Sequence, residues 1–326
     1  MKKVSVLIAV YNAEQYLRQC LDSLKNQTYR DIEVLCTDDA STDRSLGILQ
    51  EYAHDDERFK VFHHDKNQGP CRARNTSLKH STGDFVCFLD ADDWLSNDCI
   101  EKAVNTFRNN EQTDSVLFNC VYCHEDGRRE EFPMKPFVVK SGEEALIDSL
   151  TWKIHGIYMV RGNLHREYSY DDSDNVYNDE NITRVHYLRS REVRMCDGVY
   201  NYRMHPESVT HNSAFRRVLY VKTCEDMKKA LLALNCSEHI LSLYENERWR
   251  KFIDSYMYYY KYRHMFSDEE KKRCQMELHR VWKGIETDRL DGIKWKFGFM
   301  PLPFSYSLFE TQENIYFGLR KLIGGV

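Results

Sequence analysis

The 326-residue sequence lacks long apolar runs: no stretch approaches the roughly 18 to 20 consecutive apolar residues of a membrane-spanning helix. The N-terminal Met1–Tyr11 contains only a strand-length apolar run, and polar residues follow at once, so it predicts a first strand rather than a signal peptide. No G-x-G-x-x-G follows this strand, which disfavours a dinucleotide-dependent dehydrogenase. We therefore expect a cytoplasmic protein that is soluble or peripheral on the inner face of the membrane.

The cysteines lack the spacing of a disulfide framework. There are 11 of them, an odd number, and Cys120 and Cys123 form a C-x-x-C pair with no second pair to complete a zinc site. This pattern indicates a reducing compartment, in which most of the cysteines act as small buried apolar residues.

Charge is distributed unevenly along the chain. Residues 1–215 carry 26 Lys and Arg against 36 Asp and Glu, a net charge of −10, whereas residues 216–326 carry 20 against 15, a net charge of +5. So acidic a front part makes nucleic acid an unlikely partner. The basic, aromatic C-terminal part suits contact with anionic lipid, and it equally suits a solvated helical bundle or a homodimer contact.

Strand and helix patterns alternate four times in the first ninety residues or so. This alternation predicts an α/β fold with a mostly parallel, doubly wound sheet. Beyond residue 213, apolar residues recur at spacings of three and four, which predicts a helical C-terminal region. The predicted strands are 4–10, 32–36, 61–63 and 85–89, and the predicted C-terminal helices are 217–235, 238–264 and 268–287.

The stretch 85–94 is the most informative, because an apolar strand ends there in three carboxylates, Asp90, Asp92 and Asp93. Ligands of open α/β sheets bind just beyond such strand ends. Like charges this close repel one another unless a cation lies among them, and their hard oxygen atoms suit Mn²⁺ or Mg²⁺. A divalent metal site is therefore expected, although such clusters also serve as turn residues and helix caps.

Several blocks together resemble the family 2 glycosyltransferases, cytoplasmic GT-A-fold enzymes that use nucleotide sugars. Each block is weak alone, but they cover about 100 residues with consistent spacing. Ala9 and Ala40 replace the family's usual Pro and Gly, changes that a negative local φ would tolerate. The blocks are V-S-V-L-I-A-V-Y-N (4–12), L-D-S-L-K-N-Q-T-Y (21–29), D-D-A-S-T-D (38–43), N-Q-G (67–69), A-R-N (73–75), G-D-F (83–85) and L-D-A-D-D-W (89–94).

The resemblance implies a GT-A domain over residues 1–215, with a nucleotide-sugar half at 1–110 and an acceptor half at 111–215, followed by a helical region at 216–326. It implies that Tyr11 lies by the uracil ring of a UDP-sugar and that Asp39 accepts from the uracil N–H. Asp39 could instead cap the next helix beside Ser41, and Arg74 could form an ordinary surface or intra-sheet salt bridge. The implied donor-binding residues are Ala9, Tyr11, Asn12, Glu14, Asp39, Asn67, Arg74, Asp90 and Ala91.

The resemblance further implies that Asp92, Asp93 and His205 hold the metal beside the diphosphate. His205 lies in Y-N-Y-R-M-H-P-E-S-V-T (200–210), which is similar to a block near the end of the family's domain. A lone histidine can also be purely structural. Asn12 and Gln15 have the spacing of a capping box at the start of the first helix.

One carboxylate must deprotonate the acceptor hydroxyl during sugar transfer. In the family this base is the Asp of an E-D pair that opens a helix, and Asp179 occupies the matching position. Because Asn178 replaces the Glu, Glu180 and Asp174 stay open as alternatives, as does a capping role for Asp179.

The sequence thus predicts an inverting, metal-dependent glycosyltransferase that moves a sugar from a UDP-sugar to a saccharide or lipid-linked saccharide, in cell-surface polysaccharide biosynthesis. No Q-x-x-R-W block of the processive synthases occurs, which favours single additions. Residues 120–175 match poorly, so acceptor and sugar specificity do not carry over. A non-catalytic nucleotide-sugar-binding or scaffold protein and an aspartyl phosphohydrolase are the alternatives.

Overall fold

The computed structural model describes residues 2–171, 178–205 and 214–322, which form two compact units. The first unit contains the described residues up to His205, and the second contains those from Ala214 onward. The boundary at residue 215 and the division at residue 110 stay predictions.

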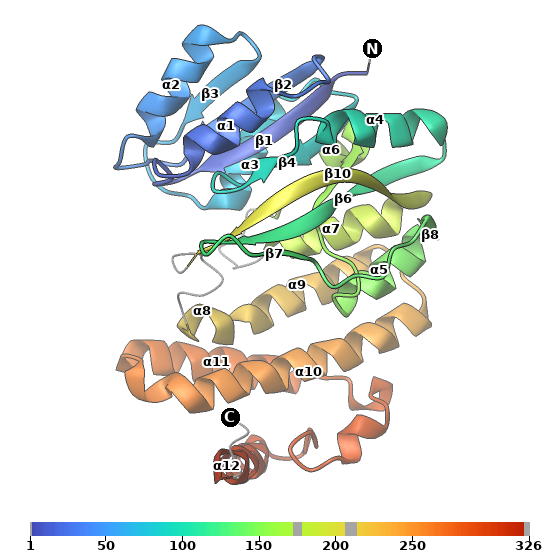
Figure 1. Cartoon of the computed structure of the whole chain (residues 1–326). Helices are drawn as coiled ribbons and strands as arrows, with labels where there is room; N and C mark the ends of the chain where they lie inside the picture. The colour runs from blue at the N-terminus through green and yellow to red at the C-terminus, as the bar shows by residue number, and fades with distance from the viewer. Residues whose placement is uncertain (1, 172–177, 206–213, 323–326) are drawn as a thin grey trace. The chain divides into compact units, whose positions relative to one another are not determined.

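Four parallel strands form one side of the sheet of the first unit, in the order β3-β2-β1-β4 (Figure 1). They are β1 (Val4–Val10), β2 (Ile32–Asp38), β3 (Phe59–His63) and β4 (Phe85–Phe88). β1 lies between β2, with which Val4–Val10 pair, and β4, with which Val4–Leu7 pair, and this interior position explains why its sequence is almost continuously apolar. The predicted α/β fold is confirmed.

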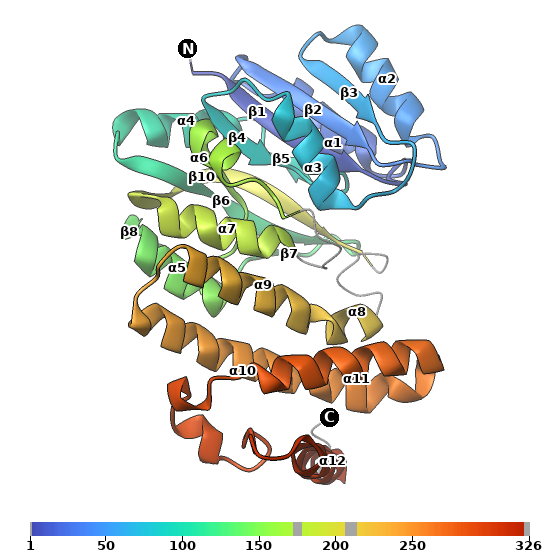
Figure 2. The same cartoon turned by 180° about the vertical axis from the view of Figure 1, so that it is seen from behind.

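Helices cover both faces of these strands. Figure 1 shows α1 (Leu17–Lys25) and α2 (Ser45–Asp55) in front of the sheet, and Figure 2 shows α3 (Pro70–Lys79) in front of the opposite face. α1 buries Leu17, Leu21 and Leu24, whose spacing places them on one side of the helix. The crossover helices leave the carboxyl ends of the strands at one edge, where the loops gather.

The rest of the sheet is mixed rather than mostly parallel. The central addition is β9, which runs antiparallel between β4 and β6 and lies in a region with no clear pattern in the sequence. β10 runs parallel to β6 as one strand with two register shifts. The strands are β5 (Trp94–Leu95), β6 (Thr113–His124), β7 (Arg129–Glu131), β8 (Val139–Ser141), β9 (Tyr158–Arg161) and β10 (Glu192–Met204).

Four more helices complete the first unit. Among them, α5 begins with a capping box in which Ser141 and Glu144 each satisfy the other's backbone N–H. α7 begins at Asn178 and carries Asp179, the predicted base, in its first turn. The helices are α4 (Cys99–Asn109), α5 (Gly142–Leu150), α6 (Gly162–Glu167) and α7 (Asn178–Arg189).

The predicted capping box at Asn12 is wrong. Asn12 has a positive φ of 49°, and α1 begins only at Leu17. The Asn12 side-chain oxygen accepts from the backbone N–H of Thr42 at 2.8 Å instead. Asn12 therefore joins the loop after β1 to the loop after β2.

Ala40 also departs from expectation, because its φ is +62° rather than negative. A left-handed conformation costs a non-glycine residue about 1–2 kcal/mol in the folded state, and glycine avoids this cost. Glycine also increases the entropy of the unfolded chain, which offsets part of the gain. We expect Ala40→Gly to raise the free energy of unfolding by about 0.5–1 kcal/mol. Urea denaturation of the two proteins would measure this, and a lower stability in the variant would contradict it.

The second unit is helical. α9, α10 and α11 match the three predicted C-terminal helices, and α12 was not predicted as a separate element. In the described part of the chain, no helix is both long and apolar enough to cross a membrane. The helices are α8 (Ala214–Val218), α9 (Tyr220–Ala233), α10 (Glu238–Tyr262), α11 (Asp268–Lys283) and α12 (Tyr306–Leu322), with short 3₁₀ turns at 263–265, 287–289 and 292–295.

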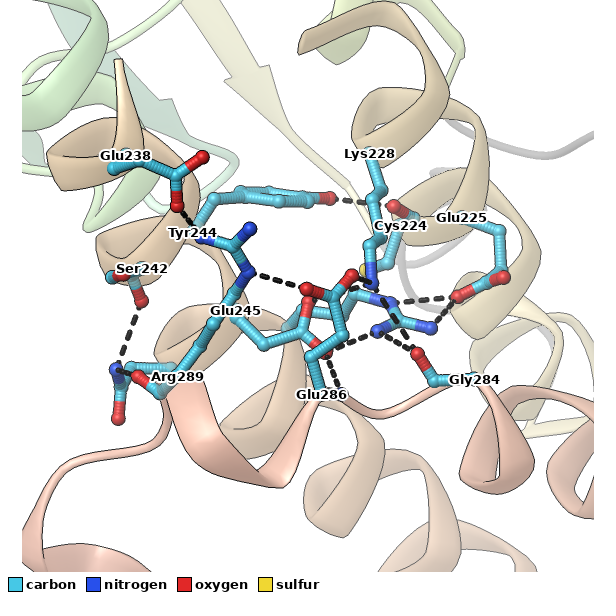
Figure 3. A network of polar contacts seen from close by, with 12 residues as sticks. Cys224, Glu225, Lys228, Glu238, Ser242, Tyr244, Glu245, Gly284, Glu286 and Arg289 are labelled. Carbon is cyan, nitrogen blue, oxygen red and sulfur yellow. Dashed lines mark hydrogen bonds and ion pairs between the residues drawn. The ribbon is translucent and has the colours of Figure 1, made fainter. Parts of the chain in front are cut away.

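A buried ion-pair network holds α9 and α10 to the segment after α11 (Figure 3). Arg248, which is 1% exposed, contacts Glu225 and donates to Glu245 at 2.6 Å. Lys228 pairs with Glu245 at 3.2 Å and Glu286 at 2.5 Å. Each of these charged groups has at least one partner of opposite charge, so we assign the network a structural role.

Candidate functional site

The site is built on the carboxyl ends of β1, β2 and β4. Because these strands are parallel and in register, Val10 lies opposite Asp38 and Leu7 opposite Phe88. The backbone N–H of Asp39 donates to the carbonyl of Val10 at 2.8 Å. Tyr11, Asp39 and Asp90, which follow the three strand ends, therefore meet at one edge of the sheet.

Asp39 is 2% exposed, and both of its carboxylate oxygens accept hydrogen bonds. The donors are the backbone N–H groups of Gln68, at 2.9 Å, and Gly69, at 2.7 Å, and the carboxylate also contacts His64 Nδ1 at 2.7 Å. Gly69 has a φ of +90°, a conformation that favours glycine. Asp39 thus fixes the loop before α3, which carries the donor-site candidate Asn67.

The helix-cap alternative for Asp39 is wrong. Asp38, not Asp39, accepts from the backbone N–H of Ser41, at 3.1 Å. Tyr11 is 50% exposed, which leaves its ring available for stacking. Asn67 is also exposed, whereas Glu14 accepts from the backbone N–H of Arg44 at 2.9 Å.

The turn after β4 presents Asp92 to solvent. Its side chain is 36% exposed, and one oxygen lies 2.9 Å from His205 Nε2. His205 Nδ1 is buried and has no hydrogen-bond partner among the described residues. The structure therefore brings two of the three predicted metal ligands together.

Asp93 points the other way and is 2% exposed. Its two oxygens accept from the Tyr200 hydroxyl and from the backbone N–H of Arg203, each at 2.7 Å. Burial raises the pKa of Asp93 well above its usual range, and the charges of Asp92 and Asp90 add to this effect. A role as a metal ligand stays a prediction for Asp93, whose visible contacts are those of a residue that holds the turn.

Arg203 locks the same turn from β10. Its Nε donates to the backbone carbonyl of Asp92 at 2.7 Å. Its guanidinium lies 4.7 Å from the ring centroids of both Tyr16 and Trp94. The turn that carries Asp92 is therefore fixed by a strand more than 100 residues later in the chain.

Arg74, on α3, is buried between two aromatic rings. Its guanidinium lies 4.7 Å from the Phe88 ring centroid and 5.6 Å from that of Tyr170, and the side chain is 4% exposed. It forms an ion pair with Asp90, and its Nη1 lies 3.5 Å from an oxygen of Asp179. A surface salt bridge is therefore excluded for Arg74, whereas a salt bridge inside the protein, with Asp90, is present, so a donor-binding role for Arg74 stays a prediction.

The electrostatics of Arg74 and Asp90 are linked. Burial lowers the pKa of Arg74, but the carboxylate of Asp90, followed by Tyr170 and Asp179, raises it, and the net shift is upward. For Asp90, burial raises the pKa, Arg74 opposes this, and the charges of Asp92 and Asp179 raise it further. Asp90, Asp92 and Asp179 thus form a compact group of carboxylates around one buried cation, Arg74.

The start of α7 separates the candidate bases. Asp179 is 42% exposed and lies near Arg74, whereas Glu180 pairs with Arg184 at 3.2 Å on its own helix. Asp174, the third alternative, lies outside the described residues. Of Asp179 and Glu180, Asp179 is therefore the carboxylate that lies beside Arg74.

Ala9 and Ala91 offer only backbone groups to a ligand, at the end of β1 and within the aspartate turn. Several supporting residues were missed from the sequence. Tyr200 and Arg203 lie in the block at 200–210, but the resemblance implied no role for them. Tyr170 lies where the sequence matches the family poorly, so no signal in the sequence indicated it.

The donor set fits a metal ion that arrives with a diphosphate. Among the residues that the structure describes, no group of three His, Cys, Asp or Glu side chains could hold an ion alone. Mg²⁺ and similar ions usually bind through one or two carboxylates together with substrate phosphates. Asp92, whose side chain is 36% exposed and lies beside His205, suits that arrangement.

Comparison with known proteins decides the family. Residues 5–171 match the profile of "Glycosyl transferase family 2". The chain belongs to this family. It is 30% identical to EpsH of Bacillus subtilis over 267 residues, which are 78% of this chain and 74% of EpsH. The glycosyltransferase is also 32% identical, over 157 residues, to the GalNAc(5)-diNAcBac-PP-undecaprenol beta-1,3-glucosyltransferase of Campylobacter jejuni, covering 48% of this chain and 50% of that protein.

Solved structures share the GT-A fold of this family member. TarS 1-349 of S. aureus in complex with UDP-GlcNAc has a TM-score of 0.74 and 18% identity, over 96% of this chain and 91% of that one. The mannosyltransferase PcManGT of Pyrobaculum calidifontis, in complex with GDP-Man and Mn²⁺, has a TM-score of 0.54 and 17% identity, over 97% and 87%. Membership of this family excludes the alternative that the protein is an aspartyl phosphohydrolase.

Proposed function

We propose that this glycosyltransferase moves a sugar from a UDP-sugar to a hydroxyl of a saccharide or lipid-linked saccharide, with inversion, in cell-surface polysaccharide biosynthesis. The observation that carries the proposal is the position of Arg74, which contacts Asp90 of the donor side and lies 3.5 Å from Asp179 of α7. A donor-binding edge and a candidate base thereby share one small region. The name of the Campylobacter jejuni relative, which contains a PP-undecaprenol-linked saccharide, supports the acceptor class.

In this mechanism, Tyr11 stacks on the uracil ring, and Asp39 and Asp90 position the nucleoside. Asp179 removes the proton from the acceptor hydroxyl as its oxygen attacks the anomeric carbon. The bond between that carbon and the diphosphate oxygen breaks on the opposite face, so one displacement inverts the configuration. A Mn²⁺ or Mg²⁺ ion held by Asp92 and His205 would supply positive charge for the leaving diphosphate. Cytoplasmic location and a homodimer stay predictions.

Calorimetric titration with UDP, GDP and CDP, with and without Mn²⁺, tests the donor half of the proposal. We expect UDP to bind with Mn²⁺ and Asp92→Ala to weaken binding at least about tenfold, because the metal loses its protein carboxylate. Asp55→Ala, which changes an exposed carboxylate on α2, is the matched control and should bind as the wild type does. UDP binding that ignores both metal and Asp92 would contradict the metal site, and failure to bind any nucleotide would favour the scaffold alternative.

A further inference from the structure

α12 exposes a narrow apolar stripe in the second unit. Leu308, Ile315, Leu319 and Leu322 are each at least half exposed. They follow one another at intervals of seven, four and three residues, which places all four on one face of the helix. The opposite face buries Phe309 and Phe317 in the core of the unit, so the helix is packed on one side and apolar on its free side as well.

Two exposed aromatic residues lie in the segment that precedes α12. Trp295 is 76% exposed and Phe297 is 45% exposed. The Phe297 ring contacts the Tyr316 ring of α12, with centroids 5.9 Å apart. We call the stripe together with Trp295 and Phe297 the α12 face.

The aromatic segment is anchored, so its exposure is a fixed feature. Gly298 has a φ of +81°, and a Cβ there would lie only 2.4 Å from the Tyr316 ring, so the backbone approaches α12 as closely as glycine permits. The indole N–H of Trp249 donates to the carbonyl of Phe299 at 2.8 Å. Trp295 and Phe297 are therefore displayed by a rigid support.

The segment 292–322, which carries the α12 face, has more basic than acidic side chains. Residues 292–322 contain four basic side chains, Lys294, Lys296, Arg320 and Lys321, and two acidic ones, Glu310 and Glu313. Glu313 is fully buried and Glu310 is partly buried, whereas Lys296 and Lys321 are exposed. A partner for this face should therefore carry negative charge and accept apolar side chains.

We propose that the α12 face docks on an anionic lipid surface. Exposed Trp, Phe and Leu side chains bordered by Lys and Arg are typical of segments that lie in the membrane interface. A two-fold contact between two copies would bring basic borders together, which is less favourable than contact with an anionic surface. The proposal deepens the proposed function, since a lipid-linked acceptor would lie at that surface.

Vesicle flotation of the full-length protein tests this proposal without donor or acceptor. We expect binding to phosphatidylcholine vesicles that contain about one third phosphatidylglycerol, little binding to phosphatidylcholine alone, and loss of binding at about 0.5 M salt. Trp295→Ala combined with Leu319→Ala should lower the bound fraction at least about fivefold, because apolar contact is removed. Lys296→Glu combined with Lys321→Glu should lower it roughly tenfold or more.

Matched double variants elsewhere in the unit serve as controls. Leu232→Ala with Met276→Ala removes comparably exposed apolar side chains, and Lys272→Glu with Lys283→Glu makes the same change in net charge. Both should bind vesicles as the wild type does. Metal-dependent UDP binding should be equal in all variants, which separates loss of docking from loss of folding.

The proposal would be overturned if the wild type ignores anionic vesicles at low salt, or if the α12-face variants bind them as well as the controls. Light scattering adds a third test. If the wild type is a dimer that Trp295→Ala with Leu319→Ala converts to a monomer, the face is a contact between copies instead. Since vesicle binding and UDP binding are measured separately, either proposal can fail while the other stands.

Discussion

Asp179→Asn is expected to lower kcat for sugar transfer by roughly 10²–10⁴-fold, the usual contribution of a general base. Asparagine keeps the shape and hydrogen-bonding capacity of aspartate at a helix start but cannot accept the proton of the acceptor hydroxyl. UDP affinity should change little, because Asp179 acts on the acceptor. Steady-state kinetics with a UDP-sugar and an active acceptor, together with UDP calorimetry, would measure both quantities.

Glu180→Gln is the matched control for this result. Glu180 is the next residue on α7, but its carboxylate pairs with Arg184. Its replacement should leave kcat within a few-fold of the wild type. Asp174→Asn covers the remaining alternative from the sequence. A large loss in Glu180→Gln or Asp174→Asn, with near-normal turnover in Asp179→Asn, would move the base to the other residue.

Arg74→Gln is expected to lower kcat by about 10²–10³-fold. Arg74 is the buried cation that contacts Asp90 and approaches Asp179, and its Nε and Nη1 have no hydrogen-bond partner among the described residues. Without it the two carboxylates repel and lose their orientation, and a displacement of about 1 Å can cost about 10²-fold in rate. The same kinetic assay measures the effect.

Two further variants test whether the shape of the Arg74 guanidinium or only its positive charge is required. Arg74→Lys keeps the charge but lacks the planar fork that can contact two carboxylates, so it should recover thermal stability more fully than kcat. Lys79→Gln removes an exposed cation from the same helix and should leave both unchanged. If folded Arg74→Gln keeps kcat within about threefold of the wild type, the assigned role of Arg74 is incorrect.

The fold of residues 1–110, the predicted nucleotide-sugar half, could be predicted because its sequence signals are local. Strands such as β1 are buried on both faces and read as continuous apolar runs, and each ends in polar residues that face the same edge. The acceptor half was not predictable in this way. β9 pairs antiparallel with β4 and β6, partners separated from it by tens of residues, and nothing in its own four residues specifies this direction.

The candidate site shows the same division. Asp90, Asp92 and Asp93 were identified from one short stretch, but their different surroundings depend on distant residues. Asp93 is buried against Tyr200, whereas Asp92 stays exposed beside His205. The positive φ of Ala40 was also not predicted, because alanine gives no local signal for a left-handed conformation.

The contacts of β10 with the aspartate turn have a consequence for engineered hybrids. Tyr200 and Arg203 hold Asp93, and Arg203 also holds the backbone of Asp92. A hybrid enzyme joined to a relative's acceptor half at residue 110 would replace both of these contacts with foreign ones. A hybrid that aims to change acceptor choice should therefore take residues 199–205 from the same parent protein as the nucleotide-sugar half.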